Sequence, residues 1–197
     1  MPKQQSGNEC HVMHGLTLSD EASAKVFFLL LKKKFLNVNG WHQIAGPALS
    51  KFILTDGNGN KVNRDVKQGD YFKIDIPGPG PLAGAGYDWV RVEAIEEINQ
   101  QGEEKISIRV RPAANPTNND TDVAHFFTGE ATSTFEIKRL HEKITAAVYG
   151  RNENPNTAVE KLTDKARNAI TATGAVNGLA KLQWENLVRG LLQLGNE

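Results

Sequence analysis

The residues that could form a metal site lie near the start of the chain, where Cys10 and His11 are adjacent and His14 follows. Thiolate sulfur and imidazole nitrogen are zinc ligands, but a zinc site needs three or four protein ligands held rigidly. The remaining histidines of the five in the chain form no second cluster near this one. We therefore expect no metal.

A glycine- and proline-rich stretch, DIPGPGPLAGAGYDWVRV, covers Asp75–Val92. A phosphate-binding P-loop continues from its last glycine into Lys-Ser or Lys-Thr, whereas here Tyr87 and Asp88 follow Gly86. A dinucleotide-binding loop opens a helix, whereas this stretch leads into a strand. Two interpretations remain: the glycines supply unusual backbone angles in a long hairpin, or small residues form the rim of a pocket in which Tyr87 or Trp89 contacts a ligand.

No recognisable catalytic constellation occurs in the sequence. The chain contains no G-x-S-x-G elbow, no H-E-x-x-H helix and no carboxylate pair at a meaningful spacing. Acids and histidines that are distant in sequence can still converge in space, so enzymatic activity is left open. No cofactor is expected.

Composition excludes several classes of partner. Twenty-three basic residues balance twenty-three acidic ones, which gives no net field to attract nucleic acid. The most apolar window, Val26–Leu31, is six residues long, against the roughly 20 that span a bilayer. The segment Met1–Gly15 is polar and Cys10 is the single cysteine, so a reducing, cytoplasmic setting is expected. A length of 197 residues fits one domain, here residues 1–197 with a mobile tail at about 1–10.

A helix is predicted over Ser19–Leu36. Ser19 is a suitable N-cap, acidic residues follow it, and a lysine triplet ends the segment, as the helix dipole favours. Its apolar residues Ala22, Val26, Leu29 and Leu30 recur at helical spacing and predict a stripe that packs on a sheet.

Strands are predicted for most of the middle of the chain. A short first strand is expected at His11–Leu18, and six further runs are rich in β-branched and aromatic residues: Leu49–Asp56, Asp70–Ile76, Asp88–Ile98, Lys105–Arg111, Thr132–His141 and Lys143–Arg151. Several alternate apolar and polar residues, which is typical of an antiparallel sheet with one covered face. Only Glu142 separates the last two runs, which leaves open one long bent strand or a hairpin. The prediction is five to seven strands.

The remaining segments are loops and a C-terminal helix. Pro112–Phe127 is predicted to be a surface loop because it is polar and contains Asn115-Pro116. Residues 151–154 (RNEN) form either a hydrogen-bonded cluster or a solvated connection. Thr157 and Glu160 form a capping box that opens a long helical region, with a kink or break expected near Gly174–Gly178.

This element order resembles the helix-grip fold of START and Bet v 1-like proteins, including polyketide cyclase-like members. The local signal is LTLSDEASAKVFFLLLKKKFLNVNGWH at Leu16–His42, in which a strand leads into a helix and a Trp-bearing turn. The resemblance covers nearly the whole chain and rests on order and pattern. It implies an α+β domain in which a curved antiparallel sheet wraps around a long C-terminal helix and leaves a cavity between them.

The resemblance favours binding of a small apolar or amphipathic molecule in that cavity. Six residues are candidates for contact with it: Trp41, His42, Tyr87, Trp89, His125 and Tyr149. The parity of Trp89 matches that of Arg91, which places it on the charged face of its strand. A cyclase- or hydrolase-like enzyme on the same scaffold and a homo-oligomeric interaction module are the alternatives.

Overall fold

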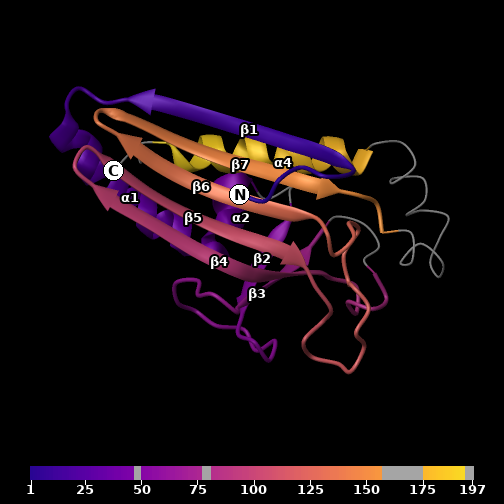
Figure 1. Ribbon diagram of the computed structural model, residues 1–197. Helices are drawn as coiled ribbons and strands as arrows, with labels where there is room; N and C mark the ends of the chain where they lie inside the picture. Colours follow the sequence, from indigo (N-terminus) through magenta and orange to yellow (C-terminus); the bar gives the residue numbers. More distant parts are fainter. Residues whose placement is uncertain (47–49, 77–80, 157–174, 194–197) are drawn as a thin grey trace.

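The structure is a computed structural model, and it describes residues 1–46, 50–76, 81–156 and 175–193 (Figure 1). The elements in chain order are β1 (Asn8–Thr17), α1 (Glu21–Leu36), the 3-10 helix η1 (Val38–Gly40), α2 (Trp41–Ala45), β2 (Lys51–Thr55), β3 (Tyr71–Asp75), β4 (Asp88–Gln100), β5 (Glu103–Pro112), β6 (Thr132–Leu140), β7 (Lys143–Glu153) and α4 (Ala175–Leu191). The predicted α+β class and element order are confirmed.

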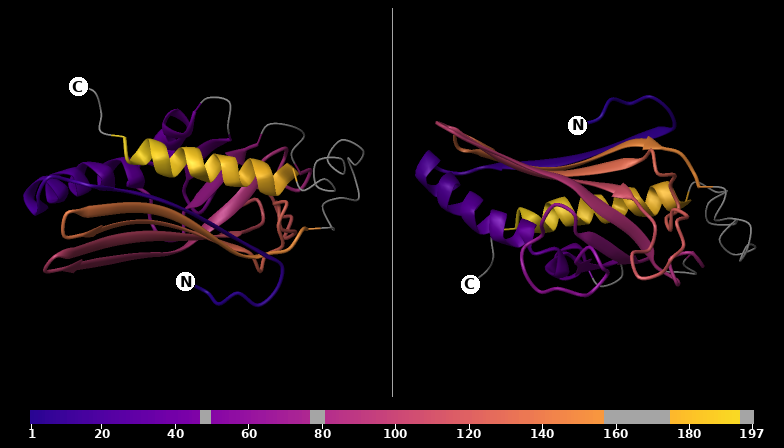
Figure 2. Two further views of the ribbon diagram at one scale, coloured as in Figure 1. Left: turned by 90° about the horizontal axis from the view of Figure 1, so that it is seen from above. Right: turned by 60° about the horizontal axis from the view of Figure 1, so that its bottom comes forward.

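The strands form one antiparallel sheet in the order β1-β7-β6-β5-β4-β3-β2. Its seven strands lie at the upper end of the predicted range. β6 and β7 form a hairpin and not one bent strand, because Leu140 pairs with Lys143 and His141 adopts a left-handed backbone conformation in the turn (φ 52°). The sheet curves around α4, which crosses its concave side, as Figure 2 shows.

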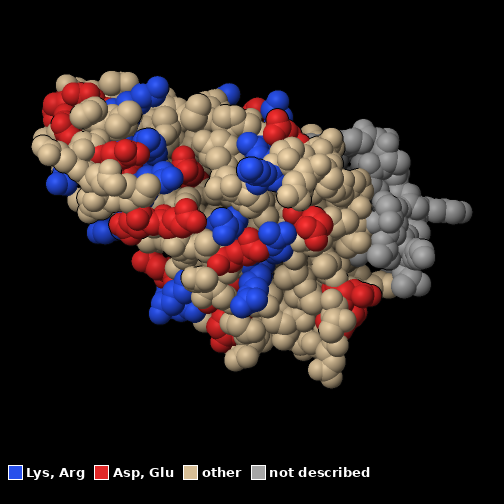
Figure 3. Space-filling view, in the orientation of Figure 1, with Lys and Arg blue, Asp and Glu red and all other residues tan. Residues whose placement is uncertain are grey.

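One face of the sheet is apolar and the other is charged, as the alternation predicted. Phe72, Val92, Ile108 and Ile137 are among the buried residues of the concave face. On the convex face, ion pairs join neighbouring strands, including Lys138 of β6 with Glu103 of β5 (2.7 Å). Figure 3 shows basic and acidic side chains interspersed over this face, without a large area of one sign.

Helix α1 packs on the sheet with a face other than the predicted one. Its buried residues are Ala24, Phe27, Phe28, Leu31 and Phe35, whereas Val26, Leu29 and Leu30 are exposed. The run VFFLLL is apolar around most of the helix, so periodicity alone did not decide which side faces the sheet. The cap is Asp20 and not Ser19: its carboxylate accepts a hydrogen bond from the Ser23 amide at 2.8 Å.

The Trp-bearing turn after α1 forms the centre of the core. The Trp41 side chain is fully buried, and its indole N–H donates a hydrogen bond to the Phe35 carbonyl at 3.0 Å. Its ring lies 5.7 Å from the rings of Phe52 and Phe72 and 4.8 Å from that of Phe135. The turn therefore joins α1 to strands β2, β3 and β6.

Helix α4 continues through Gly178, which lies inside it, while Gly174 and the predicted capping box at Thr157 fall outside the described residues. Gly190 lies against α2. A β-carbon added at Gly190 would be 2.3 Å from the Ile44 carbonyl oxygen, whereas one added at Gly178 would meet no atom within 4 Å. The close approach of α4 to α2 therefore requires a glycine at position 190.

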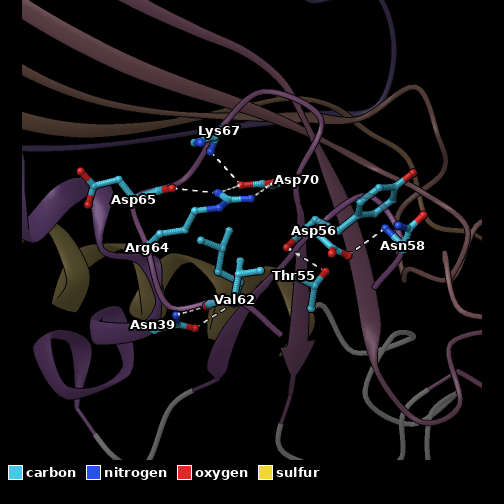
Figure 4. Close-up of polar contacts among 11 residues, drawn as sticks. Asn39, Thr55, Asp56, Asn58, Val62, Arg64, Asp65, Lys67 and Asp70 are labelled. Carbon is cyan, nitrogen blue, oxygen red and sulfur yellow. Dashed lines mark hydrogen bonds and ion pairs between the residues drawn. The ribbon is translucent and has the colours of Figure 1, made fainter. Parts of the chain in front are cut away.

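The long connection between β2 and β3 is held by charged and backbone contacts (Figure 4). The Asp56 carboxylate accepts hydrogen bonds from the Asn58 and Asn60 amides, both at 2.9 Å, in the turn that the sequence predicted. Arg64 forms a bidentate pair with the buried Asp70, at 2.7 and 2.9 Å. These contacts order the segment that continues the edge of the sheet.

The segment 112–127 is a loop as predicted, with residues 117–122 exposed, but its two ends are partly buried. It folds back over the start of β4, where the Trp89 amide donates to the Ala124 carbonyl and the Ala124 amide to the Ala113 carbonyl. Asn115, His125 and Phe127 are buried. The polar side chains of residues 117–122 are exposed, and polar side chains of the segment also serve turns, as where the buried Asn115 amide oxygen accepts from the Thr117 backbone at 2.9 Å.

The N-terminal segment lies along the end of β7. Strand β1 begins at Asn8, inside the predicted tail. The Gln5 amide donates to the Asn152 side-chain oxygen at 2.7 Å, and the Asn152 amide donates to the Gln4 side chain at 2.9 Å. Residues 151–154 therefore form the hydrogen-bonded cluster, the first of the two interpretations. Mobility of the first residues remains a prediction.

Two glycine-to-alanine changes test the packing of α4. Gly190→Ala should lower the free energy of unfolding by more than 1 kcal/mol, because its methyl group collides with the backbone of α2. Gly178→Ala should raise it by up to about 1 kcal/mol, since alanine favours a helix and the site is open. Urea denaturation of both variants measures the difference. Equal effects would contradict this description of the α2–α4 contact.

Candidate functional site

The concave side of the sheet divides into two parts. The part beneath α1 and α2 is filled by Trp41 and the phenylalanine rings around it. The part beneath the first half of α4 contains polar side chains in buried positions. We take this second part as the candidate site.

Glu153 is the central residue of the candidate site. The residue is 6% exposed, although it stands at the end of β7 in a polar stretch. Its carboxylate lies over Gly150, where an added β-carbon would be 2.0 Å from Glu153 Oε1 and 3.2 Å from Cys10 Cβ. Because residue 150 has no side chain, the Glu153 carboxylate can occupy this space beside Cys10.

Burial and nearby charges shift the titration of both groups. Desolvation raises the pKa of Glu153 to about 7, and the positive charge of Arg151 opposes this only in part. The pKa of the Cys10 thiol is also raised, first by burial and then by the negative charge of Glu153. No hydrogen bond from the described part of the chain offsets the burial of the Glu153 carboxyl.

Helix α4 carries two further side chains over the concave side, and their contacts are on the β2 side of the sheet, whereas Glu153 lies on β7. Gln183 is 4% exposed; its oxygen accepts from the Ser50 amide at 2.8 Å, while its buried Nε2 has no partner among the described residues. Trp184 is half-buried, with its ring 5.2 Å from Phe135 and 6.0 Å from Phe52. Lys181 and Glu185 act electrostatically on Cys10 from the same helix. The concave side beneath α4 therefore combines the ring of Trp184 with a buried amide, that of Gln183, whose nitrogen has no hydrogen-bond partner among the described residues.

The six residues predicted from sequence do not form one site. Trp41 is part of the packed core, and His42 lies next to it on α2, half-buried, with Nδ1 buried and unpartnered among the described residues. Tyr149 stacks on His11 at 4.6 Å between ring centres, on neighbouring strands. Ligand contact by any of the six remains a prediction.

Tyr87 and Trp89 lie together near the end of the glycine-rich stretch. The Lys73 ammonium is 3.8 Å from the Tyr87 ring centre and 5.8 Å from that of Trp89. Trp89 has the predicted parity, yet it is buried, because the segment 112–127 covers it and its indole N–H donates to the Gly84 carbonyl at 3.2 Å. A β-carbon at Gly84 would be 1.8 Å from the Tyr87 carbonyl oxygen, which supports the backbone interpretation of these glycines.

His125 belongs to the same outer cluster. It is buried, its Nδ1 accepts a hydrogen bond from the Phe127 amide at 2.9 Å, and its ring stacks on Phe126 at 4.2 Å. These contacts hold the imidazole within the segment 112–127. They account for its burial by local packing.

The histidines near the start of the chain are separated by the strand. His11 stacks on Tyr149, whereas His14, three positions later, lies toward α4 and accepts a hydrogen bond from Arg189 at 3.2 Å. A spacing of three places side chains on opposite faces of a strand. In the described part of the chain, no three His, Cys, Asp or Glu side chains are grouped as a metal would require.

A polar cleft of about 450 Å³ lies at the other end of the concave side, between the first turn of α1 and the β4–β5 turn. Arg139 lines it, and its buried guanidinium contacts Glu104 at 2.6 Å and Glu21 at 3.1 Å. The lining is not the apolar one that the cavity hypothesis predicted. The guanidinium bridges the two carboxylates and connects α1 to the sheet, which gives the three side chains a structural role.

Sequence reasoning missed Glu153, Gln183 and Trp184 as site residues. Glu153 was placed in a connection, and the only signal was its position directly after an alternating strand. From the sequence, Cys10 indicates only a candidate metal ligand and, as the single cysteine, a reducing setting. The two α4 residues carried no signal, because a helical pattern indicates a buried face and not what lies opposite it.

Comparisons with known proteins support the fold and leave the site to physical argument. No family model matches the sequence, and no curated protein matches it. A hypothetical protein from Helicobacter pylori of known structure is 11% identical, with 93% of this chain and 88% of that chain covered and a TM-score of 0.50. This likeness shows the fold alone.

Two weaker matches carry no argument about this chain. The protein Ms6760 from Mycobacterium smegmatis is 13% identical over 95% of this chain and 93% of that one, with a TM-score of 0.41. Norcoclaurine synthase from Thalictrum flavum, in complex with dopamine and hydroxybenzaldehyde, is 10% identical over 96% and 90%, with a TM-score of 0.35. The predicted helix-grip arrangement, a curved antiparallel sheet around a C-terminal helix, is confirmed as a fold by the structure itself. No described helix is long and apolar enough to cross a membrane.

The buried carboxyl makes a prediction about pH. Because its folded pKa of about 7 exceeds the ordinary value of 4.5, Glu153 favours the folded state below pH 4.5, and this contribution is lost as the pH rises through 7. Glu153→Gln mimics the protonated form, so its gain in unfolding free energy over wild type should grow from near zero at pH 4 to about 3 kcal/mol at pH 9.

Urea denaturation from pH 4 to pH 9 measures this difference. Glu9→Gln is the control, because it removes a carboxylate of the same charge from an exposed position near Arg151. A constant difference between wild type and Glu153→Gln across the pH range would contradict the assigned environment of Glu153.

Proposed function

We propose that this protein binds a small apolar or amphipathic molecule on the concave side of the sheet, beneath the first half of α4. The observation that carries the proposal is the presence of two buried polar side chains under α4, Glu153 on the β7 side and Gln183 on the β2 side. The Gln183 Nε2 is buried without a hydrogen-bond partner among the described residues, and the Glu153 carboxyl, in a residue that is 6% exposed, has its pKa raised by desolvation. A buried polar group without a partner costs about 1–3 kcal/mol, which a ligand bearing a donor and an acceptor would offset.

The surrounding side chains define the rest of the ligand. Trp184, which is half-buried, offers aromatic surface, and Cys10 adds a half-buried sulfur beside Glu153. Binding sites for small molecules are typically apolar with a few polar groups that fix orientation. The ligand class proposed is therefore an apolar body with one polar end, directed to Glu153.

The Arg139 cleft is less suited to this role. Its guanidinium already contacts two carboxylates and the His141 carbonyl, so an anionic ligand would compete with existing ion pairs. Its other lining residues include Asn99, Gln100 and Gln101, which offer little apolar surface. An amphipathic molecule gains more by burial beneath α4.

One observation favours the enzymatic alternative. A carboxyl with a pKa near 7 is suited to accept and return a proton at neutral pH, as general acid–base catalysis requires. Glu153 would be that group in a cyclase- or hydrolase-like reaction. The binding proposal needs only its hydrogen bond, so loss of turnover with retained binding in Glu153→Gln would favour the enzyme.

Native mass spectrometry of protein purified from its own host tests binding directly. We expect a retained small molecule of defined mass, lost in Cys10→Phe because the added ring fills the space beside Glu153 and Gly150. His11→Phe is the matched control: it places the same ring one residue further along β1, against Tyr149.

A thermal melt establishes that both variants fold. Wild type without any retained molecule, together with no binding of the apolar fluorescent probe 1-anilinonaphthalene-8-sulfonate, would contradict the proposal. Equal retention of the molecule by Cys10→Phe and His11→Phe would show that the ligand does not bind beside Cys10.

A further inference from the structure

Helix α1 has a second apolar face that the fold leaves uncovered. Val26 is 61% exposed, Leu29 51% and Leu30 52%. Together with exposed Ala22 they recur at helical spacing and form one surface, which we name the α1 ridge. Large apolar side chains grouped on one exposed helix face are typical of an interaction site.

The charges around the ridge are separated along the helix. Asp20 and Glu21 stand at its start, and Glu21 remains 49% exposed despite its pair with Arg139. Lys33 and Lys34 stand in its last turn. Lys25 is also exposed, between Ala22 and Leu29, so the charges run from two acidic residues at the start of the helix, past one lysine, to the two basic residues of the last turn.

We propose that the α1 ridge is a homodimer interface in which two copies of the chain pack their α1 helices antiparallel about a two-fold axis. A two-fold interface is formed by the same surface on both copies, so it must be complementary to itself. With the axis between positions 27 and 28, Val26 faces Leu29 and Leu30 of the second copy. The acidic end of each helix then faces the basic end of the other.

Charge complementarity selects this arrangement. A parallel pair would place Lys33 and Lys34 beside the same lysines, and Glu21 beside the same carboxylate, which costs free energy. An anionic membrane surface would be attracted by the lysines and repelled by Asp20 and Glu21 at the other end. A second copy in the antiparallel arrangement places opposite charges beside both ends of the helix.

The size of the ridge predicts a weak dimer. Helix α1 has 16 residues and is therefore about 24 Å long, so it buries less than the roughly 800 Å² that each partner contributes to a standard interface. We expect a dissociation constant on the order of 10 µM. The dimer should form at high protein concentration and dissociate on dilution.

Sedimentation velocity of the full chain from about 1 to about 500 µM tests the proposal. Wild type should pass from monomer to dimer, and Leu29→Lys should weaken association at least tenfold. Leu182→Lys is the matched control, because Leu182 is 47% exposed on α4, away from the ridge. Circular dichroism establishes that both variants are folded.

Cross-linking tests the orientation. In a Cys10→Ser background, the double variant Ala22→Cys with Lys33→Cys should oxidise to a covalent dimer, and Ala22→Cys alone should not. Wild type that stays monomeric at about 500 µM, or equal association of Leu29→Lys and Leu182→Lys, would overturn the proposal. Cross-linking by Ala22→Cys alone would also overturn it, as would a monomer that binds anionic vesicles through the ridge.

Discussion

The fold depends on how the concave face of the curved sheet is covered, and Trp41 supplies the central contact. Its indole is fully buried among rings from β2, β3 and β6, and its N–H is bonded to the Phe35 carbonyl at the end of α1. Truncation of a buried aromatic residue to alanine costs about 3–5 kcal/mol. One side chain thus holds the first helix, the turn after it and three strands in a fixed arrangement.

This packing also decides where a ligand has room to bind. The rings around Trp41 take up the concave side beneath α1 and α2, so the space that the helix-grip resemblance assigned to a ligand is partly occupied by the protein itself. Beneath α4 the side chains are of another kind: Glu153 is buried with a raised pKa, and Gln183 is buried with its Nε2 unpartnered among the described residues. Stability alone would favour apolar residues there, because each unpaired buried group costs free energy.

At the opposite end of the concave side, ion pairs join the start of α1 to the sheet. Arg139 is buried between Glu104 and Glu21, which fixes the start of α1 on the sheet. Since α1 is held through this pair and through its phenylalanines, the apolar side chains on its other face have no role within the chain. A helix can turn only one side toward the sheet, so the burial of Phe27 and Phe28 leaves the α1 ridge in solvent.

The sequence by itself determined the class, the order of the elements and the two faces of the sheet, because alternation in strands such as Lys105–Arg111 and turn residues such as those at Asp56–Asn60 act locally. Two features depended on segments that meet only in the fold. The sheet covers the side of α1 that carries Phe27, and the side that carries Val26 stays exposed. Residues 112–127 fold back over Trp89 and bury it, although its strand position is on the charged face. The candidate site was decided in the same way. Glu153 acquires its raised pKa from burial beside Cys10 and beneath α4, and no local pattern records which side chains distant elements bring together.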